Sequence, residues 1–175
     1  MRIIAGAWRG RRLKTPRGRN VRPTTDRVRE SWMSAMGPSI AGARVLDLYA
    51  GSGALGLEAL SRGAREVVFV ERARGALGAL RANVEQLQAG AQCRIVERDA
   101  LKYVAGLGEL EFDLALADPP YDRGMAASLV GRFAEAPFAR ELWVEHRTAE
   151  ELPEVAGLRQ RAYGDTTLTT VVADV

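Results

Sequence analysis

The sequence predicts an α/β fold in which a parallel sheet is flanked by helices and closed by an antiparallel hairpin. Short apolar runs alternate with longer helical stretches from residue 38 onward, which is typical of successive β-α-β units. Two strand-like runs near the C-terminus have no helix between them, which indicates an antiparallel pair. A strongly basic segment precedes this pattern, so we expect a short N-terminal extension on a Rossmann-like core.

The length and composition favour one domain. A chain of 175 residues with 47% apolar residues can bury one substantial core but is short for two. We therefore expect a single domain over 1–175, with a basic hairpin and helix extension at 1–37 and the Rossmann-like core at 38–175.

Several kinds of site and location are disfavoured. Cys93 is the only cysteine and His146 the only histidine, so an internal disulfide is impossible and a Cys/His zinc cluster lacks ligands. We expect no metal, a core role for Cys93 and a satisfied or solvated His146. Neither a run of about 18 apolar residues nor an apolar signal segment occurs, which predicts a soluble, cytoplasmic protein without a membrane partner.

The extension is predicted to contain a hairpin and a helix. Arg2–Ala7 and a stretch around Leu13 form the expected hairpin, followed by a loop over Arg17–Pro23. A helix is expected from about Thr25 to Met36, because Thr24 or Thr25 suits an N-cap and an acid follows directly, where the helix dipole favours it.

The core elements follow from hydrophobic periodicity. The expected strands are Arg44–Tyr49, Glu66–Glu71, Arg94–Glu97, Phe112–Ala117 and Glu141–Glu145. The expected helices cover Ala54–Ser61, a segment with Leu77, Leu80, Val84 and Leu87 on one face, and Met125–Ala134. The closing hairpin joins Leu158–Tyr163 to Thr167–Ala173 through the turn-prone Gly164-Asp165.

A glycine loop follows the first core strand. The segment Asp47-Leu-Tyr-Ala-Gly51-Ser-Gly53-Ala-Leu-Gly56 contains the G-x-G-x-x-G pattern between a strand and a helix. Glycines there allow a tight turn and a close approach of ligand to backbone. Glu71 ends the next strand, where a carboxylate can accept both hydroxyls of a ribose. These residues indicate a cofactor that contains adenosine.

The loop alone leaves the cofactor class open, because nicotinamide and flavin dinucleotides use similar loops. Asp47 would repel a pyrophosphate but attract the ammonium of a methionine moiety, so it favours S-adenosyl-L-methionine. Asp99 follows the third strand and can accept a hydrogen bond from an adenine amine. It can equally be the N-cap of a helix that begins at Ala100, and the two roles are compatible.

A second motif, Asp118-Pro119-Pro120-Tyr121, follows the fourth strand. The prolines remove two N–H donors, so the Pro119 carbonyl is left beside the Asp118 carboxylate without a strand partner. Two converging acceptors suit a planar amine, and holding both of its hydrogens directs the nitrogen lone pair out of the ring plane. Tyr121 supplies a face for stacking a base. The alternative is that these residues only end a strand and plug the core.

The basic charge is concentrated at the N-terminus. Residues 1–30 contain ten Arg or Lys and two Asp or Glu, a net charge of +8, whereas residues 31–175 have a net charge of −5. We expect RNA contacts from Arg9, Arg11, Arg12, Arg22 and Arg27, although such a run can also be a solvated face. Trp8 and Trp32 could stack on nucleotides, with a core role favoured for each.

With both motifs identified, the chain resembles the class I S-adenosylmethionine-dependent methyltransferases. Within them it resembles the bacterial family that methylates the exocyclic N2 amine of a guanine in 16S ribosomal RNA. The most specific block is Arg22-Pro-Thr-Thr-Asp-Arg-Val-Arg-Glu30. Other matching segments are Arg2-Ile-Ile-Ala-Gly6, Trp8-Arg-Gly10, Leu57-Glu-Ala-Leu-Ser-Arg-Gly63 and Tyr163-Gly-Asp165.

This resemblance implies a fold, a cofactor and a partner. The fold is a seven-stranded mixed sheet with a C-terminal antiparallel hairpin, and the partner is ribosomal RNA or a partly assembled small subunit. The oligomeric state is open, with a monomer expected. Arg72-Ala73 departs from relatives, which often have an acidic or bulky residue there. The implied cofactor residues are Asp47, Gly51 and Gly53 at the methionine end, Glu71 at the ribose and Asp99 at the adenine.

The resemblance also implies that Asp118 to Tyr121 hold the target guanine. Three rival functions remain. The nearest is an adenine-N6 methyltransferase that acts on DNA or another RNA, because D-P-P-Y suits any planar amine. The others are a dinucleotide-dependent oxidoreductase and a non-catalytic RNA-binding module.

Overall fold

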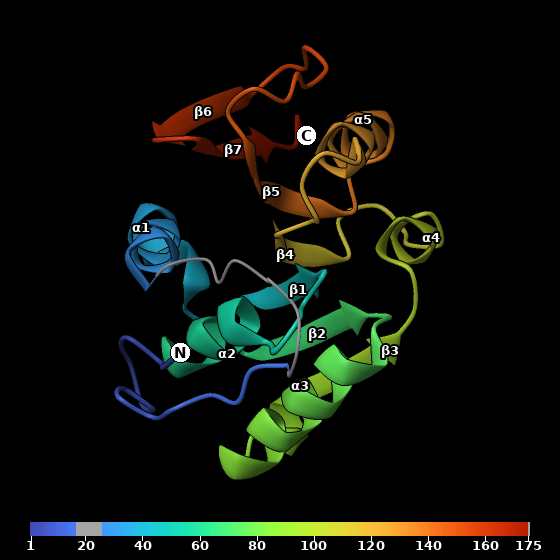
Figure 1. Cartoon of the computed structure of the whole chain (residues 1–175). Coiled ribbons are helices and arrows are strands. Elements are labelled where there is room, and N and C mark those ends of the chain that lie inside the picture. The colour runs from blue at the N-terminus through green and yellow to red at the C-terminus, as the bar shows by residue number, and fades with distance from the viewer. Residues whose placement is uncertain (17–25, 175) are drawn as a thin grey trace.

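A seven-stranded sheet runs through the molecule, with strand order β3-β2-β1-β4-β5-β7-β6 (Figure 1). The computed structural model describes residues 1–16 and 26–174. The strands are β1 (Arg44–Leu48), β2 (Glu66–Glu71), β3 (Cys93–Glu97), β4 (Phe112–Ala117), β5 (Ala139–Arg147), β6 (Leu158–Tyr163) and β7 (Thr166–Val172). The helices are α1 (Asp26–Met36), α2 (Ala54–Ser61), α3 (Arg74–Gln86), α4 (Ala100–Val104) and α5 (Met125–Glu135), with short 3-10 turns at Gly37–Ile40 and Gly90–Gln92.

The strand directions confirm the predicted mixed sheet. β1 to β5 pair in parallel, whereas β7 pairs antiparallel with both β5 and β6. β1 lies between β2 and β4. The chain therefore adds β2 and β3 on one side of β1 and then adds β4 and β5 on the other side. The carboxyl ends of β1 and β4 therefore form the switch point, where ligands bind in such folds.

Helices cover both faces of the sheet (Figure 1). One buried cluster joins Trp32 of α1, Leu57 of α2 and Leu80 of α3 to side chains of the sheet. The other joins Val104 of α4 and Phe133 of α5 to the opposite face. Because successive strand residues point to opposite faces, one apolar cluster packs against each face of the sheet.

The predicted core elements are present, with some ends shifted. β1 ends one residue early because Tyr49 adopts a left-handed backbone with φ of +57°, which cannot continue a strand. β5 is longer than the predicted Glu141–Glu145 because it pairs with β4 on one side and β7 on the other. Leu77, Leu80 and Val84 form the buried face of α3, as their spacing predicted.

The N-terminal segment packs into the same core. Ile3 and Leu13 are buried in one cluster with Trp32 and Val45. The predicted hairpin is present as a single bridge between Arg2 and Arg12 rather than as two regular strands. The predicted loop over 17–23 lies outside the described residues.

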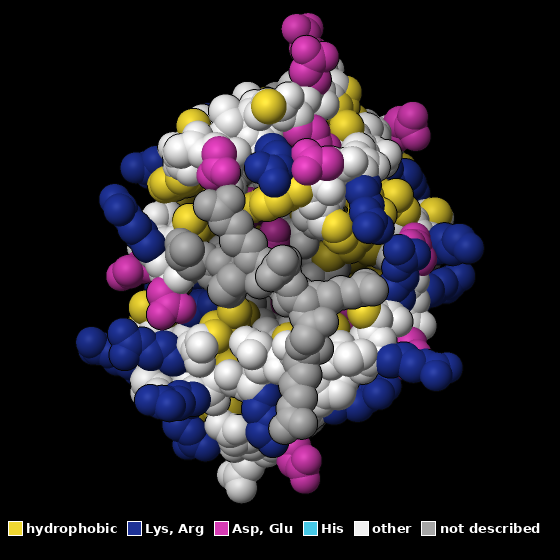
Figure 2. Space-filling model, in the orientation of Figure 1, with side chains coloured by type: hydrophobic (Ala, Val, Ile, Leu, Met, Phe, Trp, Pro, Cys, Tyr) yellow, Lys and Arg dark blue, Asp and Glu magenta, His cyan; other side chains and the backbone are white. Residues whose placement is uncertain are grey.

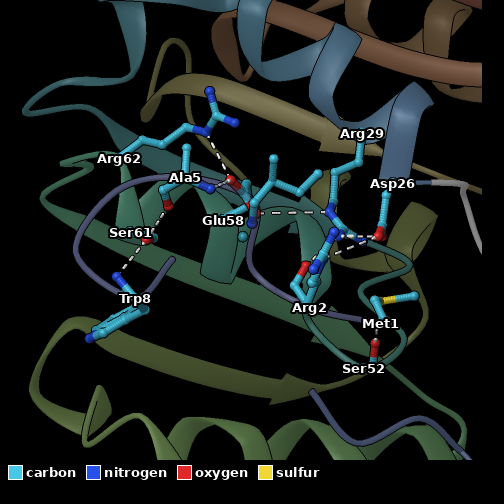
Figure 3. A network of polar contacts seen from close by, with 12 residues as sticks. Met1, Arg2, Ala5, Trp8, Asp26, Arg29, Ser52, Glu58, Ser61 and Arg62 are labelled. Atoms are coloured by element: carbon cyan, nitrogen blue, oxygen red, sulfur yellow. Dashed lines mark hydrogen bonds and ion pairs between the residues drawn. The ribbon is translucent and has the colours of Figure 1, made fainter. Parts of the chain in front are cut away.

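A buried carboxylate on α2 binds this segment (Figure 3). Glu58 is fully buried, and its two oxygens accept hydrogen bonds from the backbone N–H groups of Ile4 and Ala5 at 2.8 and 3.0 Å. It also accepts from Arg62 Nε at 2.9 Å, and Arg29 Nε lies 3.9 Å away. The negative charge is thus shared among several donors, as a buried carboxylate requires.

The turn at Gly6 comes very close to the end of α2. Gly6 has a φ of +83°, and a Cβ there would lie 1.8 Å from the carbonyl oxygen of Ser61. Ser61 Oγ donates to the carbonyl of Ala5 and accepts from the N–H of Trp8 at 3.0 Å. Only glycine fits this contact, so the extension and α2 are matched in shape.

The histidine and the cysteine have structural environments. His146 is buried, with Nδ1 2.8 Å from the carbonyl of Arg147 and Nε2 2.7 Å from Thr169 Oγ1. Because a carbonyl only accepts, Nδ1 carries the proton, and a neutral ring then accepts from Thr169 at Nε2. Burial raises the pKa of the half-buried Cys93 thiol to about 12. Within 1–16 and 26–174, no helix is both long and apolar enough to span a membrane.

Candidate active site

The two sequence motifs start from adjacent strand ends. β1 and β4 pair in parallel with Leu48 opposite Ala117, so the glycine loop and the turn from Asp118 to Tyr121 leave the sheet side by side. The charge of Asp118 is close enough to help raise the pKa of Asp47. The structure thus brings both motifs to one edge of the sheet.

The glycines of the loop have different tasks. Gly51 and Gly53 have φ values of +57° and +84°, which other residues rarely adopt. Among residues 1–16 and 26–174, a Cβ on Gly51 would meet only the carbonyl of Tyr49 at 4.0 Å, so these residues leave open space beside the loop. A Cβ on Gly56 would lie 2.4 Å from Phe69 Cε1, so this glycine lets α2 pack closely on the sheet.

Asp47 lies beneath the loop. It is 1% exposed, and Oδ2 accepts a hydrogen bond from the N–H of Gly56 at 2.9 Å. Burial raises the pKa of Asp47 well above its usual value, the Gly56 N–H opposes this, and the charges of Asp118 and Glu71 add to it. A cationic group bound nearby would relieve this cost, which fits the ammonium of a methionine moiety.

Glu71 links the loop to the end of β2. Its Oε2 accepts from the N–H of Gly51 at 2.9 Å, and Oε1 accepts from the N–H groups of Arg72 and Ala73, both at 2.8 Å. These bonds orient the carboxylate beside the open space at Gly51. A ribose there would use the acceptor capacity that remains.

Asp99 is the N-cap of α4, as the sequence allowed. Its Oδ1 accepts from the N–H of Lys102 at 3.1 Å, and Oδ2 lies 3.3 Å from Arg72 Nη1. Arg72 therefore contacts the residue predicted to bind adenine.

Tyr49 is a half-buried member of the same loop. Its hydroxyl has no hydrogen-bond partner among the described residues. Burial and the Asp99 charge raise its pKa to about 12, against the opposing charge of Arg72.

The second motif is held by residues that the sequence analysis did not identify. Pro119 is buried and Pro120 exposed, while Asp118 is half-buried. The Tyr121 hydroxyl donates to Glu145 Oε1 at 2.8 Å, and the guanidinium of Arg147 lies 5.0 Å from the centre of the Tyr121 ring. Burial raises the pKa of Tyr121, a hydrogen bond with Thr166 opposes this, and the hydrogen bond and charge of Glu145 add to it.

These contacts define how Tyr121 can be used. Glu145 is only 3% exposed, and its hydrogen bond orients the ring. Arg147 covers one ring face, so a stacked base must use the other face or displace the guanidinium. The available signal was Glu145 itself, an acid that directly follows the apolar run Leu142-Trp143-Val144.

The predicted RNA-contact arginines are surface residues where they are described. Arg9, Arg11, Arg12 and Arg27 are exposed, and Arg22 lies outside the described residues. Arg11 donates to the carbonyl of Gln86 at 3.1 Å, so it also attaches the extension to α3. In the orientation of Figure 1, Figure 2 shows Lys and Arg side chains along both margins of the molecule.

The tryptophans have core positions. Trp32 is completely buried, which excludes it as a stacking platform on the surface, and Trp8 packs half-buried against the same cluster. Arg29, within the block that carried the resemblance, is 1% exposed and bonds to Asp26 Oδ1 at 2.9 Å and to the carbonyl of Arg2. Arg29 therefore attaches the N-terminal segment around Arg2 to α1.

The residues at the switch point fit S-adenosyl-L-methionine. Three carboxylates lie at or near the carboxyl ends of β1, β2 and β3: Asp47 is buried, and Glu71 and Asp99 are half-buried. These hydrogen-bond acceptors match a molecule with an ammonium at one end and hydroxyl and amine groups at the other.

Comparisons with known proteins agree with this site. The model of the family described as "Conserved hypothetical protein 95" matches residues 1–172. "Ribosomal RNA small subunit methyltransferase D" of Escherichia coli K12 is 38% identical over 158 residues, which cover 89% of this chain and 79% of that protein. "Putative rRNA methyltransferase YlbH" of Bacillus subtilis is 37% identical over 173 residues, which cover 94% of each chain.

Solved structures agree as well. The structure titled "Putative methyltransferase yhhF from Escherichia coli" superposes with a TM-score of 0.85 at 36% identity, covering 97% of this chain and 96% of that one. A hypothetical protein of Thermus thermophilus, TTHA0928, gives a TM-score of 0.82 at 31% identity, covering 99% of both chains. The fold, the two motifs and these matches together show that the chain belongs to the Conserved hypothetical protein 95 family of ribosomal RNA methyltransferases, which have the class I S-adenosylmethionine-dependent fold.

Proposed function

We propose that this chain transfers a methyl group from S-adenosyl-L-methionine to the exocyclic N2 amine of a guanine in 16S ribosomal RNA. The observation that carries the proposal is the pairing of β1 with β4, which puts the glycine loop and the Asp118 turn at one switch point. A cofactor bound on one segment and a base held by the other then share one space.

The cofactor supplies an electrophilic methyl group on a sulfonium. Asp47, Gly51 and Gly53 bind its methionine end, where the buried carboxylate attracts the ammonium. Glu71 binds the ribose hydroxyls and Asp99 the adenine amine. Because the carboxylates of Glu71 and Asp99 already accept bonds from backbone N–H groups, they need little rearrangement to bind.

The target guanine stacks on Tyr121 after leaving its helix or loop. The Asp118 carboxylate and the Pro119 carbonyl accept the two amine hydrogens, and Pro120 stiffens the turn. With the cofactor bound, its sulfonium would supply the methyl group and leave as the thioether, the amine held by these acceptors would receive the methyl, and Asp118 would take the proton that the amine loses, directly or through water. The rate enhancement comes mainly from alignment.

Two observations support RNA as the substrate. The E. coli relative is named as a methyltransferase of small-subunit ribosomal RNA, and it aligns over most of this chain. The exposed arginines of the N-terminal extension, Arg9, Arg12 and Arg27 among them, supply positive charge that would attract an RNA backbone.

The test is methyl transfer from tritiated cofactor to free 16S ribosomal RNA and, in parallel, to partly assembled small subunits. Nucleoside analysis should yield N2-methylguanosine from at least one of them. N6-methyladenosine, or transfer to DNA alone, would instead support the adenine-N6 alternative. No transfer to any of these substrates by a protein that binds the cofactor would refute the proposal.

A further inference from the structure

The C-terminal strands form a row of basic and aromatic side chains that leads away from Tyr121. Residues directly opposite in neighbouring strands share a sheet face. Tyr163 of β6 is opposite Thr166 of β7, which is opposite Arg147 of β5. Arg161 is opposite Leu168, which is opposite Glu145. Arg159, Arg161 and Tyr163 therefore lie on the same face as the residues that hold Tyr121; we call these three residues the β6 face.

A surface groove separates the β6 face from α1. Arg27, Glu30, Ser31 and Ser34 of α1 line one side, and Arg161 lines the other. Arg27 and Arg161 are exposed, so two guanidinium groups lie on opposite walls with one acid, Glu30, beside them. Serine hydroxyls and arginines are the groups that bind phosphate oxygens in nucleic-acid complexes.

Two arginines of this region lie over aromatic rings. Arg161 lies 5.5 Å from the centre of the Tyr163 ring, as Arg147 does at 5.0 Å from Tyr121. Arg147 is also paired with Asp122 at 3.2 Å and Asp165 at 3.8 Å, so its charge is already balanced. We therefore assign Arg147 to the ring and not to a phosphate.

We propose that the β6 face and the groove beside α1 bind the RNA strand that flanks the target nucleotide. Arg27, Arg159 and Arg161 contact its phosphates, and Tyr163 stacks a neighbouring base. Charge complementarity and continuity with Tyr121 favour RNA as the occupant. The inference rests on the proposed function, because that function makes Tyr121 the site of the target nucleotide from which the flanking RNA extends. RNA binding by the β6 face can nevertheless be measured without methyl transfer.

A competing explanation is that these arginines only protect an edge strand. β6 is the last strand of the sheet, and charged side chains on edge strands discourage pairing with other chains. β3, at the other edge, offers a matched control because Arg94 is also an exposed arginine on an edge strand. It lies far along the sheet from Tyr121, with β2, β1, β4, β5 and β7 between the two edge strands that carry the arginines.

The experiment compares the double variant Arg159→Ala/Arg161→Ala with Arg94→Ala. Binding of a fluorescein-labelled single-stranded RNA of mixed sequence is measured across a series of salt concentrations without cofactor. The double variant should bind about tenfold more weakly at low salt, and the slope of log affinity against log salt should fall by about 1.4, as expected for two lost phosphate contacts. Arg94→Ala should match the wild type.

Further measurements separate this inference from the proposed function. Arg159→Lys/Arg161→Lys keeps the charges and should restore the salt slope, and calorimetry should show unchanged cofactor affinity in every variant. If the double alanine variant binds RNA with wild-type affinity, whether or not it self-associates, the inference is overturned. Methyl transfer by the wild type would still support the proposed function. Weakened binding by a protein that methylates no RNA keeps the inference and overturns the function.

Discussion

The two sides of the candidate active site are held by different kinds of contact. On the cofactor side, the carboxylates of Asp47, Glu71 and Asp99 each accept hydrogen bonds from backbone N–H groups. On the target side, Tyr121 is held by side chains, through its hydrogen bond to Glu145 and the guanidinium of Arg147. One side therefore depends on the path of the backbone, and the other depends on particular side chains.

This difference predicts how each side responds to substitution. A contact made by a backbone N–H survives a change of the donor residue's side chain, but it is lost when the loop cannot keep its conformation. A contact between two side chains is lost when either is truncated. Glycine positions should thus dominate the cofactor side, and single polar groups should dominate the target side.

The largest effect is expected for Asp118→Ala. Loss of the acceptor for the target amine should lower kcat by about a thousandfold, while the dissociation constant of the cofactor changes by less than about twofold. Glu71→Gln is the opposite case, because its amide N–H₂ would face backbone N–H donors, so cofactor affinity should fall. Single-turnover kinetics and calorimetry provide the two readouts. Equal losses of both quantities in Asp118→Ala would mean that the residue is structural.

The next effect concerns the packing of the glycine loop. A Cβ at Gly56 would lie 2.4 Å from Phe69 Cε1 and 2.8 Å from Val67 Cγ1, so Gly56→Ala should lower the free energy of unfolding by about 1–3 kcal/mol. Gly78 lies within α3 with no atom near its virtual Cβ, so Gly78→Ala should raise this free energy by about 0.5–1 kcal/mol. Urea unfolding measures both. Equal effects of the two substitutions would show that close packing at Gly56 is not the constraint.

A smaller effect should come from one hydroxyl group. Tyr121→Phe removes the bond to the buried Glu145, so the ring is less well oriented and kcat should fall about tenfold. Tyr49→Phe removes a buried hydroxyl without a partner among the described residues, so it should keep or raise the free energy of unfolding and should lower kcat much less than Tyr121→Phe does. Steady-state kinetics measures kcat of both variants. Equal changes of kcat in Tyr121→Phe and Tyr49→Phe would contradict the comparison.

The smallest effect is a dependence of stability on pH. Because burial raises the pKa of Asp47 in the folded protein, the folded state binds this proton more tightly than the unfolded state. The contribution to stability is complete below the unfolded pKa of about 3.9, and it is lost as pH rises through the folded pKa. Asp47→Asn cannot titrate, so its stability relative to wild type should increase as the pH rises above about 4. A difference in urea midpoint that stays constant with pH would exclude this ionisation.

Much of the fold was predictable because burial leaves a periodic pattern in the chain. The alternation of strands and helices located the core strands, and only their ends shifted, as at Tyr49, where a left-handed backbone ends β1. The glycine loop and the Asp118 turn were predictable for a related reason, since their residue types are required by the local backbone. Asp99 was correctly identified as a possible N-cap because its partner is only three residues away.

The remaining features could not be read from local pattern. Glu58 and Arg29 lie in one network with the N-terminal backbone, although the chain segments involved are up to 54 residues apart. Arg29 belongs to the arginine-rich segment that suggested RNA contact, yet it is only 1% exposed. A buried polar side chain can be recognised in the sequence because it interrupts an apolar pattern. The sequence does not show which distant residue is its partner.

The order of the strands along the chain, the glycine loop and the types of residue at the switch point are all encoded locally in the sequence. The contacts of Glu145 and Arg147 with Tyr121, and the position of Arg161 across a groove from Arg27, follow instead from the packing of distant segments. The two kinds of feature differ in the range of the interactions that produce them. Backbone conformation and periodic burial depend on neighbouring residues, whereas a side-chain contact depends on which distant segments the closed sheet brings together.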